Sequence, residues 1–193
     1  ALSNLGSLLG LLTYPFAVEP LLGLHDQTVF WSAGYGVFAA CTAWCALAMV
    51  RARPRARAQT PDDPTTEPQP RSHIALWLGL SAFGVILLLA ITNELTKNIS
   101  PFPFLWVIPL ALYLISFILS FAGPRWYRRR LWVGVFCSAL IPTLWLSFIW
   151  QSIGLIALVV VCSISLFSGC MVCHGELARL KPGSHRLTSF YLV

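Results

Sequence analysis

Charged residues are scarce in this sequence. Only 10% of its 193 residues are Asp, Glu, Lys or Arg, while 57% are hydrophobic and the mean hydropathy is +0.74. A soluble globular domain carries charge on about a quarter of its residues. The stretch from Leu131 to Cys173 has no charged residue at all. The scarcity excludes a soluble globular domain and predicts an all-α, polytopic bundle of transmembrane helices.

Motifs of nucleic-acid-binding proteins are also missing, although the formal net charge is +6. In a membrane protein such an excess is explained by basic residues in the cytoplasmic loops. We therefore predict no nucleic-acid partner. A disulfide framework is not expected either, because four of the six cysteines lie inside apolar runs, where cysteine acts as a small hydrophobe. These are Cys41, Cys45, Cys137 and Cys162.

The apolar runs predict about six membrane spans. The stretch from Leu131 to Cys173 would measure about 65 Å as one helix, twice the hydrocarbon thickness of a bilayer, so it must form two spans. Their only polar break is Gln151-Ser152. Pro109 and Pro142 fall inside spans and should kink them. The first four spans are expected at 1–18, 29–50, 74–92 and 104–122.

The segment at 51–72 interrupts this pattern. It reads "RARPRARAQTPDDPTTEPQPRS" and is rich in Arg and Pro with almost nothing apolar, so we expect a disordered loop. Both chain ends look like parts of helices, which suggests a section of a longer protein. The predicted organisation is two spans in 1–50, the loop 51–72, four spans in 73–173, and a loop with the start of a further span in 174–193.

Basic residues predict the orientation of the spans. If the spans alternate, the loops 51–72, 123–130 and 174–187 share one face and hold twelve of the thirteen Lys and Arg residues, leaving Lys97 on the other face. By the positive-inside rule these loops are cytoplasmic. We therefore expect a multi-pass protein of the bacterial inner membrane, with both ends inside.

Cys170, Cys173 and His174 form the C-x-x-C-H spacing of covalent haem attachment. That chemistry takes place on the outer side of a bacterial membrane, whereas the expected topology puts this motif at the inner end of the last span. We therefore predict no haem c, and no cofactor. The three residues share one helix face and are the candidates for a metal, although a second ligand pair is missing. His174 alone could ligate a chlorophyll or haem iron. The simpler interpretation places it at the lipid–water boundary.

Ionisable residues near membrane depth are candidate functional sites. Glu19 lies between Pro15 and Pro20, where we expect the first helix to break. Asn93, Glu94 and Lys97 follow the third span on the same predicted outer face. The four polar residues could form one outward-facing cluster. The simpler alternative leaves Glu19 in water and pairs Glu94 with Lys97 across one helix turn.

Several stretches resemble a bacterial family of membrane proteins fused to a spermidine-synthase-like domain. They are "ALSNLGSLLGLLTYPFAVEPLLGL", "FWSAGYGVF", "PFPFLWVIPLALYLISFIL" and "MVCHGELARLKPGSHRLTSFYL". The resemblance implies a major-facilitator-like membrane region followed by a soluble aminopropyltransferase-like domain. The Gly-rich nucleotide pocket and acidic cluster which that chemistry needs do not occur in this sequence.

Three hypotheses about function follow. The first is a non-catalytic membrane module, either the membrane part of a spermidine-synthase-like protein or an accessory subunit of a larger membrane complex. Its partners would be the lipid bilayer and other membrane subunits or spans. The second is a transporter of a small cation or polyamine, with Glu19 and Glu94 at the pathway. The third is a cofactor-binding redox subunit that uses Cys170, Cys173 and His174.

Overall fold

The computed structural model describes residues 2–51, 71–97, 104–149 and 154–181, and every regular element within these ranges is a helix. The all-α class predicted from composition is therefore confirmed for the described residues. Four helical stretches are long and apolar enough to cross a bilayer, which indicates a multi-pass membrane protein. These stretches are Leu24–Arg51, Ile74–Thr96, Leu105–Ala122 and Leu155–Arg179.

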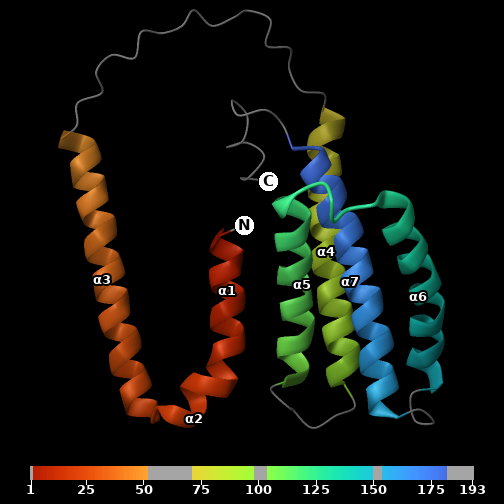
Figure 1. Ribbon diagram of the computed structural model, residues 1–193, viewed down its shortest axis with the longest axis horizontal. Coiled ribbons are helices and arrows are strands. Elements are labelled where there is room, and N and C mark those ends of the chain that lie inside the picture. Colours follow the sequence, from red (N-terminus) through yellow and green to blue (C-terminus); the bar gives the residue numbers. More distant parts are fainter. Residues whose placement is uncertain (1, 52–70, 98–103, 150–153, 182–193) are drawn as a thin grey trace, which may run out of the picture. The chain divides into compact units, whose positions relative to one another are not determined.

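The chain divides into two compact units, Ala1–Leu12 with Pro70–Val193, and Thr13–Gln69. The first unit contains a bundle of four helices that alternate in direction, so that α5 and α7 run the same way (Figure 1). They are α4 (Arg71–Thr96), α5 (Phe104–Ala122), α6 (Arg129–Ile149) and α7 (Leu155–Arg179).

Helix α7 is the central helix of the bundle. It packs against α4, α5 and α6, and α4 also packs against α5 (Figure 1). The main core cluster joins Ile91 and Leu95 of α4 to Leu158, Cys162 and Leu166 of α7. Within its most apolar window 44% of α7 is buried, compared with 17% in α4 and 22% in α5. A site built on α7 is therefore walled by three other helices.

Small side chains let the neighbouring helices approach α7 closely. A Cβ built on Gly169 would overlap Leu87 of α4 and crowd Phe136 of α6. Close approach of this kind is how membrane helices gain packing energy, because apolar burial alone gives little advantage over lipid. The lack of a side chain at Gly169 therefore leaves room for Leu87 of α4 and Phe136 of α6 against α7.

Several predicted bounds are confirmed and others are wrong. Helix α5 has the bounds of the span expected at 104–122, and α6 is a helix where the fifth span was expected; that α6 crosses the membrane stays a prediction. The helices run on through Pro109 and Pro142, and kinks at these residues stay a prediction. The predicted loop 51–72 lies almost wholly outside the described residues. The predicted break at Gln151-Ser152 lies wholly outside them.

The last predicted span ends too early. We expected a loop from His174 onward, whereas α7 continues to Arg179. Charged residues alone do not stop a helix, and Glu176, Leu177, Ala178 and Arg179 are all good helix formers. Pro182 disfavours helical backbone at the residue before it, which fits an end shortly after Arg179. Helix α4 likewise extends to Thr96, four residues beyond the predicted span.

We expected a single span from Ala1 to Val18, but the N-terminal stretch contains three successive helical segments. Helix α1 (Leu2–Thr13) is followed by a π-helical turn, η1 (Tyr14–Val18), and a short α2 (Glu19–Leu21). Pro15 lacks the N–H group that a regular helix needs there, and a widened turn accommodates its ring. The chain becomes extended only at Leu22, so the break comes after Glu19.

In the unit Thr13–Gln69, α3 (Leu24–Arg51) is the long helix. The chain bend before it is fixed by Gln27, whose Nε2 donates a hydrogen bond of 2.9 Å to the Leu22 carbonyl oxygen. The hydroxyl of Tyr14 donates to Gln27 Oε1 at 3.2 Å. Gln27 is the buried residue of α3 and satisfies a carbonyl that the end of α2 leaves free.

Candidate functional site

His174 is buried inside the bundle, and its expected place at the lipid–water boundary stays a prediction. Only 3% of the residue is exposed. Its ring meets Tyr113 edge to face, with the ring centroids 4.8 Å apart, and Phe117 at 5.1 Å. On the α4 side it faces Gly84, where a Cβ would come within 3.7 Å of His174 Nε2. Three helices thus enclose the imidazole.

The His174 ring is hydrogen-bonded to Ser116 of α5. His174 Nδ1 is 3.0 Å from Ser116 Oγ. Ser116 has one hydroxyl proton and donates it to the Tyr113 carbonyl oxygen at 2.7 Å. When the hydroxyl proton is donated to the Tyr113 carbonyl oxygen, Ser116 Oγ accepts a proton from His174 Nδ1. The other ring nitrogen, Nε2, faces Gly84 on α4.

Cys170 lies one turn before His174 and Cys173 directly before it, and both are buried, with 0% and 3% of the residue exposed. Both thiols are free. Covalent attachment of a haem to them would require the bundle to open. In the part of the chain that the structure describes, no three His, Cys, Asp or Glu side chains are grouped so that they could hold a metal ion. The three candidate metal ligands are therefore not brought together as a site.

A second polar group joins the C-terminal end of α7 to the segment between α5 and α6. The Tyr127 hydroxyl donates a hydrogen bond of 2.6 Å to Glu176 Oε1. Arg129 Nε and Arg179 Nη1 each lie 3.4 Å from the same oxygen. Both guanidinium groups are more than half exposed, so these ion pairs add little stability. The Tyr127 bond fixes the connection to α7.

Gly175 is what allows Tyr127 to reach Glu176. A Cβ built on Gly175 would overlap the Tyr127 ring, so the ring lies directly against the α7 backbone. Burial, and next the hydrogen bond to Glu176, raise the pKa of the Tyr127 phenol above its ordinary value of 10.0. The phenol is therefore neutral and acts as a hydrogen-bond donor near physiological pH.

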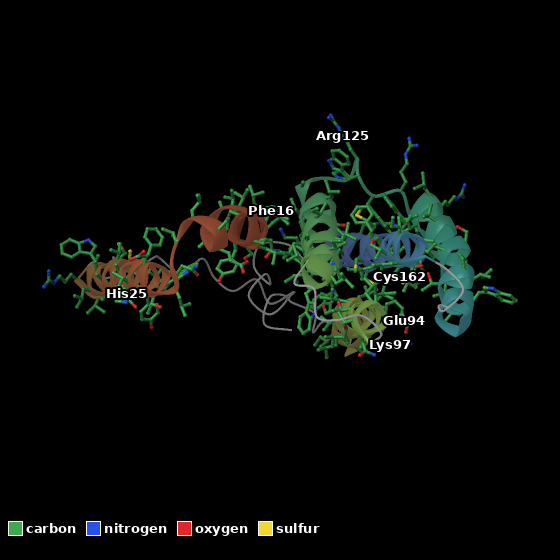
Figure 2. The ribbon with its side chains drawn as sticks, turned by 90° about the horizontal axis from the view of Figure 1, so that it is seen from below. Phe16, His25, Glu94, Lys97, Arg125 and Cys162 are labelled. Atoms are coloured by element: carbon green, nitrogen blue, oxygen red, sulfur yellow. The ribbon has the colours of Figure 1, made fainter. Side chains whose placement is uncertain are left out.

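A cavity of about 410 Å³ opens beside this group, between the end of α5, the α5–α6 segment and the end of α7. We call it the basic cavity. Arg179 and Lys181 supply its positive charge. The remaining wall combines apolar and small polar residues, among them Ser120, Phe121, Tyr127 and Gly175. Arg125 extends from the same segment away from the bundle (Figure 2). The arrangement can bind an anion with an apolar portion.

The predicted polar cluster is described only in part. Lys97 Nζ donates to Glu94 Oε2, and the two side chains lie together at the end of α4 (Figure 2). This is the pairing across one turn that we expected as the simpler alternative. Glu94 Oε1 is buried, and no group in the described ranges gives it a hydrogen bond. Asn93 and Glu19 are exposed, and Glu19 belongs to the other unit. A cluster that includes Glu19 stays a prediction.

Sequence reasoning missed two contacts, Ser116 with His174 and Tyr127 with Glu176. They join residues 58 and 49 positions apart. One signal was available for the first contact, since Ser116 and Ser120 lie one turn apart in an otherwise apolar span and require partners when buried. No comparable signal marks Tyr127. The burial of Ser116, at 0% exposed, shows that the serine side of α5 faces inward.

Comparison of the chain with protein-family models, with curated proteins and with solved structures gave no match. The resemblance to membrane-fused spermidine-synthase-like proteins therefore stays a prediction drawn from the sequence.

Proposed function

We propose that this chain is a non-catalytic integral membrane module of the bacterial inner membrane. It would form the membrane part of a spermidine-synthase-like protein, or an accessory subunit of a larger membrane complex. The observation that carries the proposal is the use of polar side chains around α7 to bind helix to helix. A membrane scaffold needs such bonds, because apolar surfaces gain little from leaving lipid.

Two hydrogen bonds between helices support this role. His174 of α7 bonds to Ser116 of α5 at 3.0 Å, and Ser165 of α7 bonds to Thr143 of α6 at 2.6 Å. Bonds of this type contribute on the order of 0.6–2 kcal/mol each in membrane helix packing. Each of these polar atoms is committed to a neighbouring helix, which suits packing better than catalysis.

Purification from native membranes in a mild detergent tests the proposal. We expect the chain to be recovered either within a longer polypeptide or with a partner at a constant molar ratio, measured by intact-complex mass spectrometry. Recovery as a lone, homogeneous polypeptide that shows a haem absorption band would refute it. The His174→Ala variant, compared with wild type, then separates loss of a cofactor from loss of packing, since only a cofactor site changes the absorption spectrum.

A second candidate, the transport of a small cation or polyamine, rests on Glu94. Its buried Oε1 has no hydrogen-bond donor among the described residues, while Oε2 pairs with Lys97. A buried carboxylate oxygen without a donor attracts a cation or an amine. Uptake of labelled spermidine into proteoliposomes tests this candidate. If the chain is a transporter, Glu94→Gln abolishes uptake. The control Asp26→Asn, which changes an exposed carboxylate of the other unit, leaves uptake unchanged. Absence of uptake by the wild type excludes transport of spermidine.

A further inference from the structure

A second, apolar depression lies on the bundle besides the basic cavity. It has a volume of about 340 Å³ and is formed where α5, α6 and α7 meet. We call it the apolar groove. Leu112, Trp132, Val135, Ile164 and Phe167 supply most of its wall, and the rings of Trp132 and Phe167 meet edge to face at 5.5 Å.

The basic cavity and the apolar groove lie on the same side of α7. Ile164, Phe167 and Ser168 border the groove, and Gly175, Ala178 and Arg179, each eleven residues later, border the cavity. Eleven residues make just over three turns, so the two sets share one helix face, about 16 Å apart along the axis. One leaflet of a bilayer has a hydrocarbon thickness of about 15 Å. The spacing therefore matches a phosphate group and the chain attached to it.

Charge at this end of the bundle favours an anion. The segments 123–130 and 176–181 contain six basic side chains and a single carboxylate, Glu176, which already has Tyr127, Arg129 and Arg179 as partners. The C-terminal end of α7 carries a partial negative charge that would repel a phosphate. Arg179 and Lys181 lie at that end and reverse the local field.

We propose that the α5–α7 side of the bundle binds one anionic phospholipid. Its phosphate occupies the basic cavity, held by Arg179 and Lys181, and an acyl chain lies in the apolar groove against Ile164 and Phe167. Basic pockets between membrane helices at the cytoplasmic side bind acidic lipid headgroups in this way. The inference is independent of the proposed function, since a scaffold and a transporter could equally hold a structural lipid.

Lipid binding by the purified chain in detergent tests the proposal. Phosphatidylglycerol, phosphatidylcholine and inorganic phosphate are each titrated, and bound ligand is counted by native mass spectrometry alongside the midpoint of thermal unfolding. We expect saturable binding of one phosphatidylglycerol, a raised midpoint, and at least tenfold weaker binding of phosphatidylcholine. Inorganic phosphate that binds as tightly as phosphatidylglycerol would overturn the proposal, because the acyl chain would then contribute nothing.

A double variant tests the phosphate half of the site. Arg179→Gln with Lys181→Gln should weaken phosphatidylglycerol binding about thirtyfold, from two basic contacts of ordinary strength. The matched control, Arg125→Gln with Arg130→Gln, removes the same charge from exposed residues that do not line the cavity and should change binding less than threefold. Equal losses in the two double variants would indicate general attraction to a basic surface and would contradict a defined site.

The groove is tested by filling it. Ile164 is 47% exposed, so Ile164→Trp can be accommodated at the bundle surface while its ring occupies the space of the acyl chain. We expect at least a tenfold loss of phosphatidylglycerol binding with little change in the unfolding midpoint of the lipid-free protein. Ile156→Trp, on an 80% exposed residue outside the groove, is the control. Unchanged binding in Ile164→Trp would refute the assignment of the acyl chain.

Discussion

Replacing Gly175 by alanine should destabilise the bundle, although alanine is the better helix former. A Cβ at this position overlaps the Tyr127 ring, so the ring has to move. A displaced ring loses its 2.6 Å hydrogen bond to Glu176, and bonds to a charged acceptor contribute about 1.5–3 kcal/mol. The gain in helix propensity from glycine to alanine is at most about 1 kcal/mol. The expected net loss is about 0.5–2 kcal/mol.

Gly134 provides the matched control for this substitution. It lies inside α6, is exposed, and a Cβ there would have no neighbour within 4 Å. Gly134→Ala should therefore stabilise the protein by up to about 1 kcal/mol through helix propensity alone. The two variants are predicted to shift the free energy of unfolding in opposite directions. Reversible denaturation in detergent micelles, followed by tryptophan fluorescence, measures both.

The pKa of the Tyr127 phenol gives a second test of whether the ring moves in Gly175→Ala. In the wild type, burial and the bond to Glu176 raise the pKa of the Tyr127 phenol. If the ring moves in Gly175→Ala, it loses both and its pKa falls. The ionisation of Tyr127 should therefore move to lower pH in Gly175→Ala than in the wild type. It is measured as the difference in ultraviolet absorbance between each of these proteins and the same protein carrying Tyr127→Phe. An alanine variant that is as stable as Gly134→Ala and has an unchanged titration would show that Tyr127 does not rest on Gly175.

Two further predictions concern the same bundle. Ser116→Ala removes the buried hydrogen-bond partner of His174 Nδ1 and should cost about 1–3 kcal/mol. Ser138→Ala, at an exposed serine bonded to its own helix, should change stability by less than about 0.5 kcal/mol in the same denaturation assay. Because folding raises the pKa of Tyr127, its contribution is fully present below pH 10.0 and is lost as pH rises toward the folded value. The stability advantage of wild type over Tyr127→Phe should accordingly shrink above pH 10.0; an advantage that grows with pH would reverse the assigned direction.

The helices themselves could be predicted from composition and punctuation. The span expected at 104–122 coincides with α5, and in the sequence Pro101 and Pro103 precede this helix and Gly123-Pro124 follows it. The end of α7 was misplaced because the prediction stopped at the first charged residues. A helix that leaves the membrane can continue beyond it, and here the sequence signal for the end is Pro182.

The surroundings of His174 could not be predicted, because they depend on which helices pack together. In the sequence His174 is next to Gly175 and Glu176, which suggested a polar boundary. In the bundle its neighbours are Ser116, Tyr113 and Phe117, all on α5. Single-sequence reasoning finds the period of a helix but not its partners, so the environment of a residue on α7 follows only once α5 is placed.

The composition of α7 follows from the bilayer as a solvent. In water a central helix would be rich in leucine, because burial of apolar surface drives folding. In lipid a leucine gains little by leaving one apolar surroundings for another, so small and hydroxyl side chains must supply the attraction. Ser165 and Gly169 do this on α7, Ser165 by a hydrogen bond to Thr143 of α6 and Gly169 by leaving room for Leu87 of α4. His174 and Ser165, which are polar residues in an apolar sequence, both bond to neighbouring helices in this bundle.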